Sequence, residues 1–258
     1  MLRRSVTLIL LLCRLAAYGG GPLYTGSSIV AIRTPQNIFV GEDSKVVALG
    51  RASSNGLTAS KIVQVDNLFF ASAGLLRDEK GLFNVRETVL KARQAGDSIY
   101  ETAERFTAMI VPCLTNAVGD VERASPGLFK SSNTWPSVEI IFFGVVHGVP
   151  VLCVRYFNLD LSFVPPKVTV GRLDCPGDCA TGMTWAFAGN HTEMEKFLDS
   201  NPGYLKKNGF VPTINVLIQK EIEAAPDHVG PPIEILMVDK AGARWLQRKP
   251  QTPDVRPY

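Results

Sequence analysis

Two charged residues stand at the ends of apolar, strand-like runs near the start of the chain. Asp43 closes the run Ile38–Asp43, and Lys61 opens the run Lys61–Asp66. Charged side chains at such places ordinarily lie on the surface. A serine hydroxyl follows a glycine at Gly26-Ser27. A hydroxyl, a carboxylate and an ammonium group are the kinds of group that nucleophilic catalysis uses.

Other catalytic patterns are missing from the sequence. The chain contains no G-x-S-x-G elbow, no phosphate-binding G-x-x-x-x-G-K-[ST] loop, no G-x-G-x-x-G and no H-E-x-x-H. Its three histidines are scattered, so a Ser-His-Asp arrangement cannot be argued. A serine at a chain N-terminus needs no histidine, because its own α-amine can accept the hydroxyl proton near neutral pH.

The spacing of these residues resembles that of the proteasome β-type subunits, which are N-terminal-nucleophile (Ntn) hydrolases. In that family a glycine precedes a nucleophilic threonine that self-cleavage exposes as the new N-terminus. An acid ends the second strand, a lysine opens the third and a glycine closes the fourth. The pattern falls here on Gly26-Ser27, Asp43, Lys61 and Gly74, with serine in place of threonine. Thr25 as nucleophile would break the spacing to Asp43, so Ser27 is preferred.

The resemblance implies a self-processing peptidase or amide hydrolase that forms an acyl-enzyme on Ser27. Lys61 would favour the alkoxide and keep the amine a free base, and Asp43 would hold Lys61 in place. A backbone N–H near Gly74 would face the oxyanion. The family's accessory catalytic positions fall on Asn190 and Asp227. An ordinary loop asparagine and an aspartate at a helix end would explain these two residues equally well. The residues that would line the first specificity pocket, or pack in a core, are Ala59, Val63, Ser72 and Leu76.

The resemblance also implies peptide or unfolded-protein substrates and a homo-oligomeric ring, with no cofactor, no metal and no nucleic acid. Two alternatives stay open, because a fold alone does not specify a function. One is a non-catalytic structural subunit of the same fold, and the other is an Ntn amidase or acylase for small substrates. The presence of both Lys61 and Asp43 argues against the non-catalytic subunit, since an inactive site would not need a cation and an anion at this spacing.

Composition predicts one large folded domain with an export signal in front of it. The 258 residues are 46% hydrophobic and 20% charged. Three arginines among residues 1–26, a stretch without an acid, account for the formal charge of +3, so the rest is neutral and offers no basic face to nucleic acid. Residues 1–26 combine this basic start with the apolar run Val6–Leu12 and Ala16-Ala17, which predicts a signal peptide and a short pro-segment.

This leader predicts an extracytoplasmic protein, periplasmic or secreted after signal removal. An uncleaved leader acting as a membrane anchor, or a cytoplasmic protein with a wrong start codon, are the alternatives. Cys175 and Cys179 bracket a Pro-Gly-Asp loop, and an oxidising compartment would let them pair. Zinc needs a second pair of ligands at a suitable spacing, which the sequence lacks. A local disulfide or free thiols are therefore expected.

The hydrophobic pattern predicts an α+β fold over residues 27–247. Strands are expected at Ser28–Arg33, Ile38–Asp43, Lys61–Asp66, Leu68–Ala73, Val138–Val146, Val151–Phe157, Lys167–Arg172, Met183–Ala188, Ile233–Val238 and Arg244–Gln247. Helices are expected at Thr192–Leu198, at Pro212–Ala224 and twice within Val85–Ala117, where Ser98 and Glu101 form a capping pair. Two packed antiparallel sheets flanked by helices use this order, as does the four-layer αββα sandwich of Ntn hydrolases. The polar, proline-rich tail 248–258 is expected to be disordered.

Overall fold

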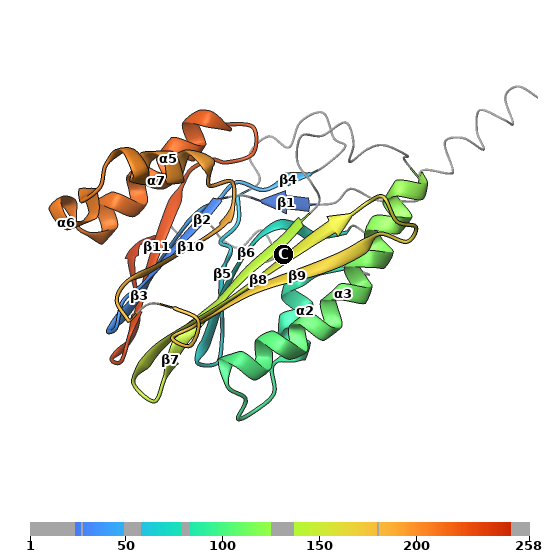
Figure 1. Ribbon diagram of the computed structural model, residues 1–258, viewed down its shortest axis with the longest axis horizontal. Helices are drawn as coiled ribbons and strands as arrows, with labels where there is room; N and C mark the ends of the chain where they lie inside the picture. The colour runs from blue at the N-terminus through green and yellow to red at the C-terminus, as the bar shows by residue number, and fades with distance from the viewer. Residues whose placement is uncertain are drawn as a thin grey trace, which may run out of the picture.

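Two antiparallel sheets lie face to face in the computed structural model of this protein, and helices cover both outer faces (Figure 1). The structure describes residues 24–26, 28–48, 58–78, 83–124, 137–179 and 181–248, with the backbone alone at 24–26, 48 and 137. The predicted four-layer α+β sandwich is confirmed. Most of the predicted leader, Ser27 and nearly all of the tail lie outside the described residues.

The larger sheet has seven strands in the order β4-β1-β6-β7-β8-β9, with β5 paired to β6. Each of its pairings is antiparallel, and a long meander from β6 to β9 forms its centre. Its strands are β1 (Tyr24–Gly26), β4 (Val47–Ala48), β5 (Ile62–Val65), β6 (Leu68–Arg77), β7 (Ser137–Val146), β8 (Val149–Asp160) and β9 (Lys167–Cys175).

The smaller sheet has five strands in the order β10-β2-β3-β11-β12. Its central hairpin joins β2 to β3 through the turn after Arg33, where the Thr34 hydroxyl accepts hydrogen bonds from the N–H groups of Gln36 and Asn37. The strands are β2 (Ser28–Arg33), β3 (Asn37–Asp43), β10 (Thr184–Gly189), β11 (Ile233–Asp239) and β12 (Gly242–Gln247).

Five helices complete the described part of the chain: α2 (Val85–Ala92), α3 (Ile99–Ala124), α5 (Thr192–Ser200), α6 (Tyr204–Asn208) and α7 (Phe210–Ala224). The predicted capping pair is present at the start of α3, where Glu101 accepts from the Ser98 N–H at 2.7 Å and donates its own N–H to the Ser98 hydroxyl at 3.2 Å. Strands β1 and β4 and helix α6 were not predicted, because they are too short to carry a hydrophobic period. None of these helices is long and apolar enough to cross a membrane.

Hydrophobic side chains fill each of the three interfaces between layers. Alternation along β3 explains how one strand serves two of them. Ile38 and Val40 point into the space between the sheets, whereas Phe39 faces the outer helices. Gly41 also faces these helices, and a Cβ added there would lie 2.1 Å from Cγ2 of Ile214 on α7. The glycine therefore allows helix α7 to lie directly on the sheet.

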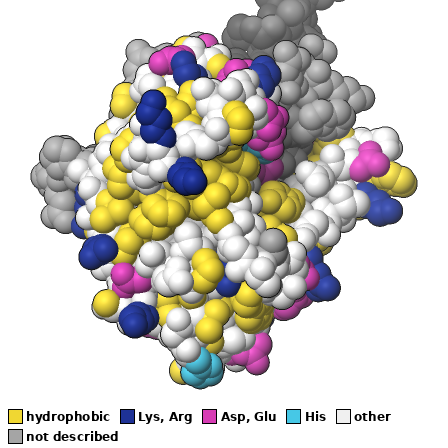
Figure 2. Space-filling model, turned by 60° about the vertical axis from the view of Figure 1, so that its left-hand side comes forward, with side chains coloured by type: hydrophobic (Ala, Val, Ile, Leu, Met, Phe, Trp, Pro, Cys, Tyr) yellow, Lys and Arg dark blue, Asp and Glu magenta, His cyan; other side chains and the backbone are white. Residues whose placement is uncertain are grey.

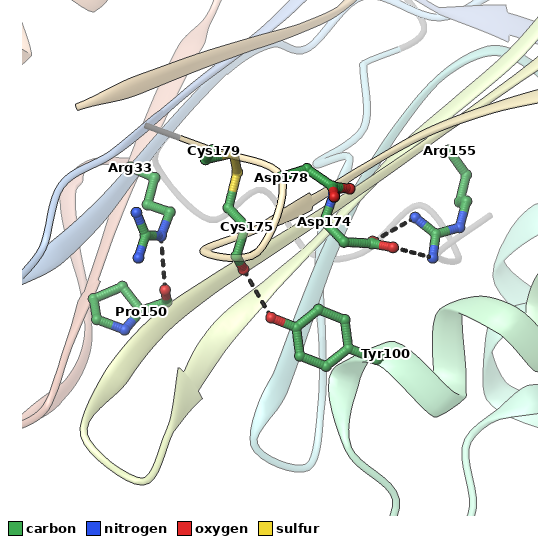
Figure 3. The surroundings of a disulfide bond; sticks show 8 residues. All are labelled: Arg33, Tyr100, Pro150, Arg155, Asp174, Cys175, Asp178 and Cys179. Atoms are coloured by element: carbon green, nitrogen blue, oxygen red, sulfur yellow. Dashed lines mark hydrogen bonds and ion pairs between the residues drawn. A yellow bond between two sulfur atoms is a disulfide. The ribbon is translucent and has the colours of Figure 1, made fainter. Parts of the chain in front are cut away.

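A disulfide between Cys175 and Cys179 closes the loop after β9, which decides between the predicted disulfide and free thiols (Figure 3). The Tyr100 hydroxyl at the start of α3 donates to the Cys175 carbonyl at 2.9 Å. Nearby, the buried guanidinium of Arg155 bridges Asp174 at 2.6 Å and Glu104 at 2.8 Å. Arg33, the last residue of β2, lies at this end, so the loop is at the opposite end of β2 from Ser28.

Candidate active site

Asp43 and Lys61 form a buried ion pair where the two sheets meet. Asp43 is the last residue of β3, and Lys61 directly precedes β5 in the other sheet. The Lys61 Nζ lies 2.7 Å from Asp43 Oδ1 and 2.7 Å from the Asp43 main-chain oxygen. The side chain of Lys61 is 2% exposed and that of Asp43 is 0% exposed. Such burial costs desolvation energy, which the ion pair and further hydrogen bonds offset.

The Asp43 carboxylate also accepts hydrogen bonds from three main-chain N–H groups. Oδ1 accepts from Ser28 at 2.9 Å, and Oδ2 accepts from Lys45 and Gly230 at 3.0 Å each. These donors lie at the start of β2, just after β3 and just before β11. The carboxylate therefore joins three separate segments of the smaller sheet to Lys61.

Ser28 is held from a second side by the turn after β10. Its hydroxyl donates to the main-chain oxygen of Asn190 at 2.6 Å. The preceding residue, Gly189, donates its N–H at 2.6 Å to a carboxylate oxygen of Glu139 on β7. Burial raises the pKa of Glu139, and the Gly189 N–H opposes that effect. Asn190 thus lies beside the start of β2, as a main-chain acceptor.

Gly26 and Gly74 are direct partners across the antiparallel strands β1 and β6. Gly74 has a φ of +79°, a left-handed conformation that favours glycine. Ser27, which joins Gly26 to Ser28, lies outside the described residues. The segment on its N-terminal side is therefore a strand of the larger sheet, and the segment on its C-terminal side is a strand of the smaller one.

Glu42, the neighbour of Asp43, is a fully buried acid that points between the sheets. Its Oε1 accepts from the Lys61 N–H at 2.8 Å and from the Ser60 hydroxyl at 3.1 Å. Burial, opposed by Lys61 and reinforced by Glu234, raises its pKa to about 8. Sequence reasoning missed this residue, although an acid directly before Asp43 in the apolar run Ile38–Asp43 was a usable signal.

The remaining predicted residues differ in how far they are buried. Asp227 is exposed in the loop between α7 and β11, and it is Gly230 of that loop that reaches Asp43. Ser72 is buried, whereas the other three predicted pocket residues are half-buried: Ala59, Val63 and Leu76. Val63 packs against the core beneath α2 and α3. Within the described residues, no three His, Cys, Asp or Glu side chains are grouped as metal ligands.

No protein-family model matches the chain, and no curated protein matches it in sequence. Similar solved structures include the helical assembly of the Anbu complex from Pseudomonas aeruginosa, with 16% identity over 89% of this chain and 88% of that chain and a TM-score of 0.48. Anbu (ancestral β-subunit) from Yersinia bercovieri is 13% identical over 86% of this chain and 88% of that chain, with a TM-score of 0.46. Such similarity carries no functional argument.

The predicted assignment to the family of proteasome β-type subunits is therefore wrong. The similar structures are Anbu proteins, which have a proteasome-like fold but form a distinct family, and the identity to them is low. The spacing of glycine, serine, acid and lysine that suggested the assignment is set by the strands of a fold in which two sheets pack between two helical layers. Because one fold hosts several families, that spacing does not separate them.

Proposed function

We propose that this protein is a self-processing amide hydrolase whose nucleophile is the hydroxyl of Ser27. The observation that carries the proposal is the buried Asp43–Lys61 pair, bound directly to the Ser28 N–H. Ser28 directly follows Ser27 in the chain, so the carboxylate that holds the Lys61 ammonium is hydrogen-bonded to the residue next to the proposed nucleophile. An ammonium group at that place would stabilise an alkoxide, and its carboxylate partner would keep it charged and oriented.

In the proposed self-cleavage, the Ser27 hydroxyl attacks the Gly26 carbonyl carbon. The C–N bond then breaks, which leaves Gly26 as an ester on the Ser27 oxygen and frees the α-amine of Ser27. Water hydrolyses the ester and releases the Gly26 carboxylate. In later turnovers the freed amine takes the hydroxyl proton as the serine attacks a substrate amide.

The pairing of β1 with β6 supports this step independently. It brings the Gly26 backbone opposite Gly74, whose N–H is the proposed oxyanion donor. A donor in the right place lowers the barrier by about 3 kcal/mol. The same pairing holds the Gly26 backbone in an extended strand beside β6.

The proposed substrates are amide bonds, and most simply peptide bonds in short or unfolded chains. A small-molecule amide is the other substrate class for the same chemistry. Fluorogenic peptides and acyl-amides, tested side by side on the processed protein, separate the two classes.

A second candidate function is a non-catalytic subunit that assembles with copies of itself. Three observations favour it. Asp227 is exposed, while Gly230 of the same loop contacts Asp43, and the hydrogen bonds to Asp43 give the Asp43–Lys61 pair a structural role of its own. Hydrophobic side chains also gather over the middle of one face (Figure 2), and surfaces of this kind are often buried on assembly.

The intact mass of the purified protein separates the two functions. We expect the wild-type chain to begin at Ser27 and the Ser27→Ala variant to retain the preceding residues. Thr25→Ala is the matched control, which should still be processed at Ser27. A wild-type chain that retains Tyr24–Gly26, with the same N-terminus as Ser27→Ala, would overturn the hydrolase and leave the assembling subunit.

A further inference from the structure

Glu139 of β7 is a second acid that joins the two sheets, on the side of β2 away from β3. It lies directly opposite Ala73, the neighbour of Gly74 on β6. Alternation along β7 points its side chain between the sheets, on the same side as Ile141. Its Oε2 accepts a hydrogen bond from the main-chain N–H of Gly189 at 2.6 Å. This contact joins the centre of the larger sheet to the end of β10 in the smaller one.

Gly189 lies where the edge strand β10 turns towards helix α5. Its φ of +75° is a left-handed conformation that favours glycine. Strand β10 has one neighbouring strand, so an N–H on its outer side needs an acceptor from elsewhere, and Glu139 supplies it here. The Gly189 carbonyl oxygen lies 2.7 Å from Nδ1 of His191. Both main-chain polar groups of this glycine are therefore held by side chains.

The turn that Glu139 holds is the one that binds Ser28. Gly189 and Ser28 are direct partners across β10 and β2. The Ser28 hydroxyl donates to the main-chain oxygen of the next residue, Asn190, at 2.6 Å. Its main-chain N–H donates at 2.9 Å to Asp43, which belongs to a different segment. The residue after the proposed nucleophile is thus held by its hydroxyl through one acid and by its N–H through another.

We propose that Glu139 is a positioning residue for the cleavage before Ser27. Its carboxyl group fixes the turn at Gly189, and the turn fixes Ser28 and with it the bond between Gly26 and Ser27. The inference rests on the proposed function, in which the serine hydroxyl must be aligned with the Gly26 carbonyl carbon. Such alignment is demanding, because a displacement of about 1 Å can cost about 100-fold in rate. Glu139 acts through the turn and takes no part in proton transfer.

The rate of self-cleavage, followed by intact mass after cell-free synthesis of the full-length chain, tests this role. Glu139→Ala removes the acceptor of the Gly189 N–H and should slow cleavage on the order of 10–100-fold. Glu139→Gln keeps a carbonyl oxygen that can accept the same hydrogen bond, so it should cleave at close to the wild-type rate. A Glu139→Gln variant as slow as Glu139→Ala would point to proton transfer by the carboxyl group and overturn the positioning role.

Asp239→Ala is the matched control for a general loss of stability. Asp239 is also a half-buried acid, and its Oδ1 accepts one main-chain N–H, that of Ala241, at 2.7 Å in the turn between β11 and β12. We expect this variant to lose stability in urea to a similar extent as Glu139→Ala and to be cleaved at the wild-type rate. Equal cleavage rates of Glu139→Ala and Asp239→Ala would overturn the proposal.

Amide hydrogen exchange separates this inference from the proposed function. In a Ser27→Ala background, which cannot cleave by the proposed route, adding Glu139→Ala should speed exchange of the Gly189 and Ser28 N–H groups, and adding Asp239→Ala should not. Unchanged exchange at Ser28 would overturn the inference while leaving the hydrolase intact. A wild-type chain that is not cleaved would defeat the proposed function, and the exchange rates would then decide alone whether Glu139 holds Ser28.

Discussion

The main-chain N–H of Ser28 donates to Asp43 Oδ1 at 2.9 Å, and the same oxygen lies 2.7 Å from the Lys61 ammonium. One carboxylate oxygen therefore joins the residue that follows Ser27 to a buried cation from the other sheet. The contact matters for stability whether or not the chain is an enzyme, because any change at Lys61 leaves Asp43 buried. Stability and cleavage can therefore be measured separately on the same variants.

Lys61→Ala should destabilise the fold strongly and abolish cleavage before Ser27. Removing one partner of a buried ion pair typically costs about 3–5 kcal/mol, because the other charge stays buried without compensation. Urea unfolding measures the free energy, and intact mass measures the cleavage. Lys220→Ala, at an exposed lysine on α7, is the control and should change stability by less than about 0.5 kcal/mol. A Lys61→Ala variant as stable as the wild type would contradict this account of the pair.

Gly74→Ala should slow cleavage beyond what its effect on stability explains. A non-glycine residue at the φ of +79° costs about 1–2 kcal/mol, and the strain would shift the backbone that lies opposite Gly26. Gly148→Ala is a matched control, since Gly148 has the same φ and lies in the turn between β7 and β8. Both variants should lose similar stability in urea. Only Gly74→Ala should retain the uncleaved chain, and equal processing of both would remove Gly74 from the proposed oxyanion site.

Gly41→Ala should loosen helix α7 from the smaller sheet. The added Cβ would lie 2.1 Å from Cγ2 of Ile214, and overpacking of this kind costs about 1–3 kcal/mol. Ile214→Ala alone leaves a cavity that costs about 2–5 kcal/mol. The double variant should lose less stability than the sum of the two, because the new methyl group occupies space that Ile214 vacates. Strictly additive losses in urea unfolding would show that the two residues do not compete for space.

Removal of the disulfide by Cys175→Ser should lower stability by about 2 kcal/mol, since the bridge closes a short loop and short loops gain little from closure. Reducing agent should lower the melting temperature of the wild-type protein to about that of the Cys175→Ser variant, and should leave the melting temperature of the variant unchanged. Cys113→Ser, at a free cysteine, is the control and should remain sensitive to reductant. Equal melting temperatures of the wild type with and without reductant would contradict a stabilising bridge.

Much of the secondary structure followed from local pattern. The strand at Ser28–Arg33 was predicted with the bounds that the structure has, because it carries its own hydrophobic period. The predicted strand from Leu68 and the second of the two predicted helices also form, but they continue past their predicted ends to Arg77 and Ala124. The capping pair of Ser98 and Glu101 is equally local. Strand β1 has only three residues and exists through pairing with β4 and β6, which no local pattern encodes.

The sequence by itself determined the residue types and the spacing of Asp43, Lys61 and Gly74, since these depend on chain order alone. Only the tertiary structure decided that the Lys61 ammonium lies 2.7 Å from an Asp43 carboxylate oxygen. It also decided that Gly26 lies opposite Gly74 and that Glu42 lies opposite Glu234. Each of these contacts joins different strands. Strand order and register, which the packing of two sheets settles, therefore determined which buried charges meet.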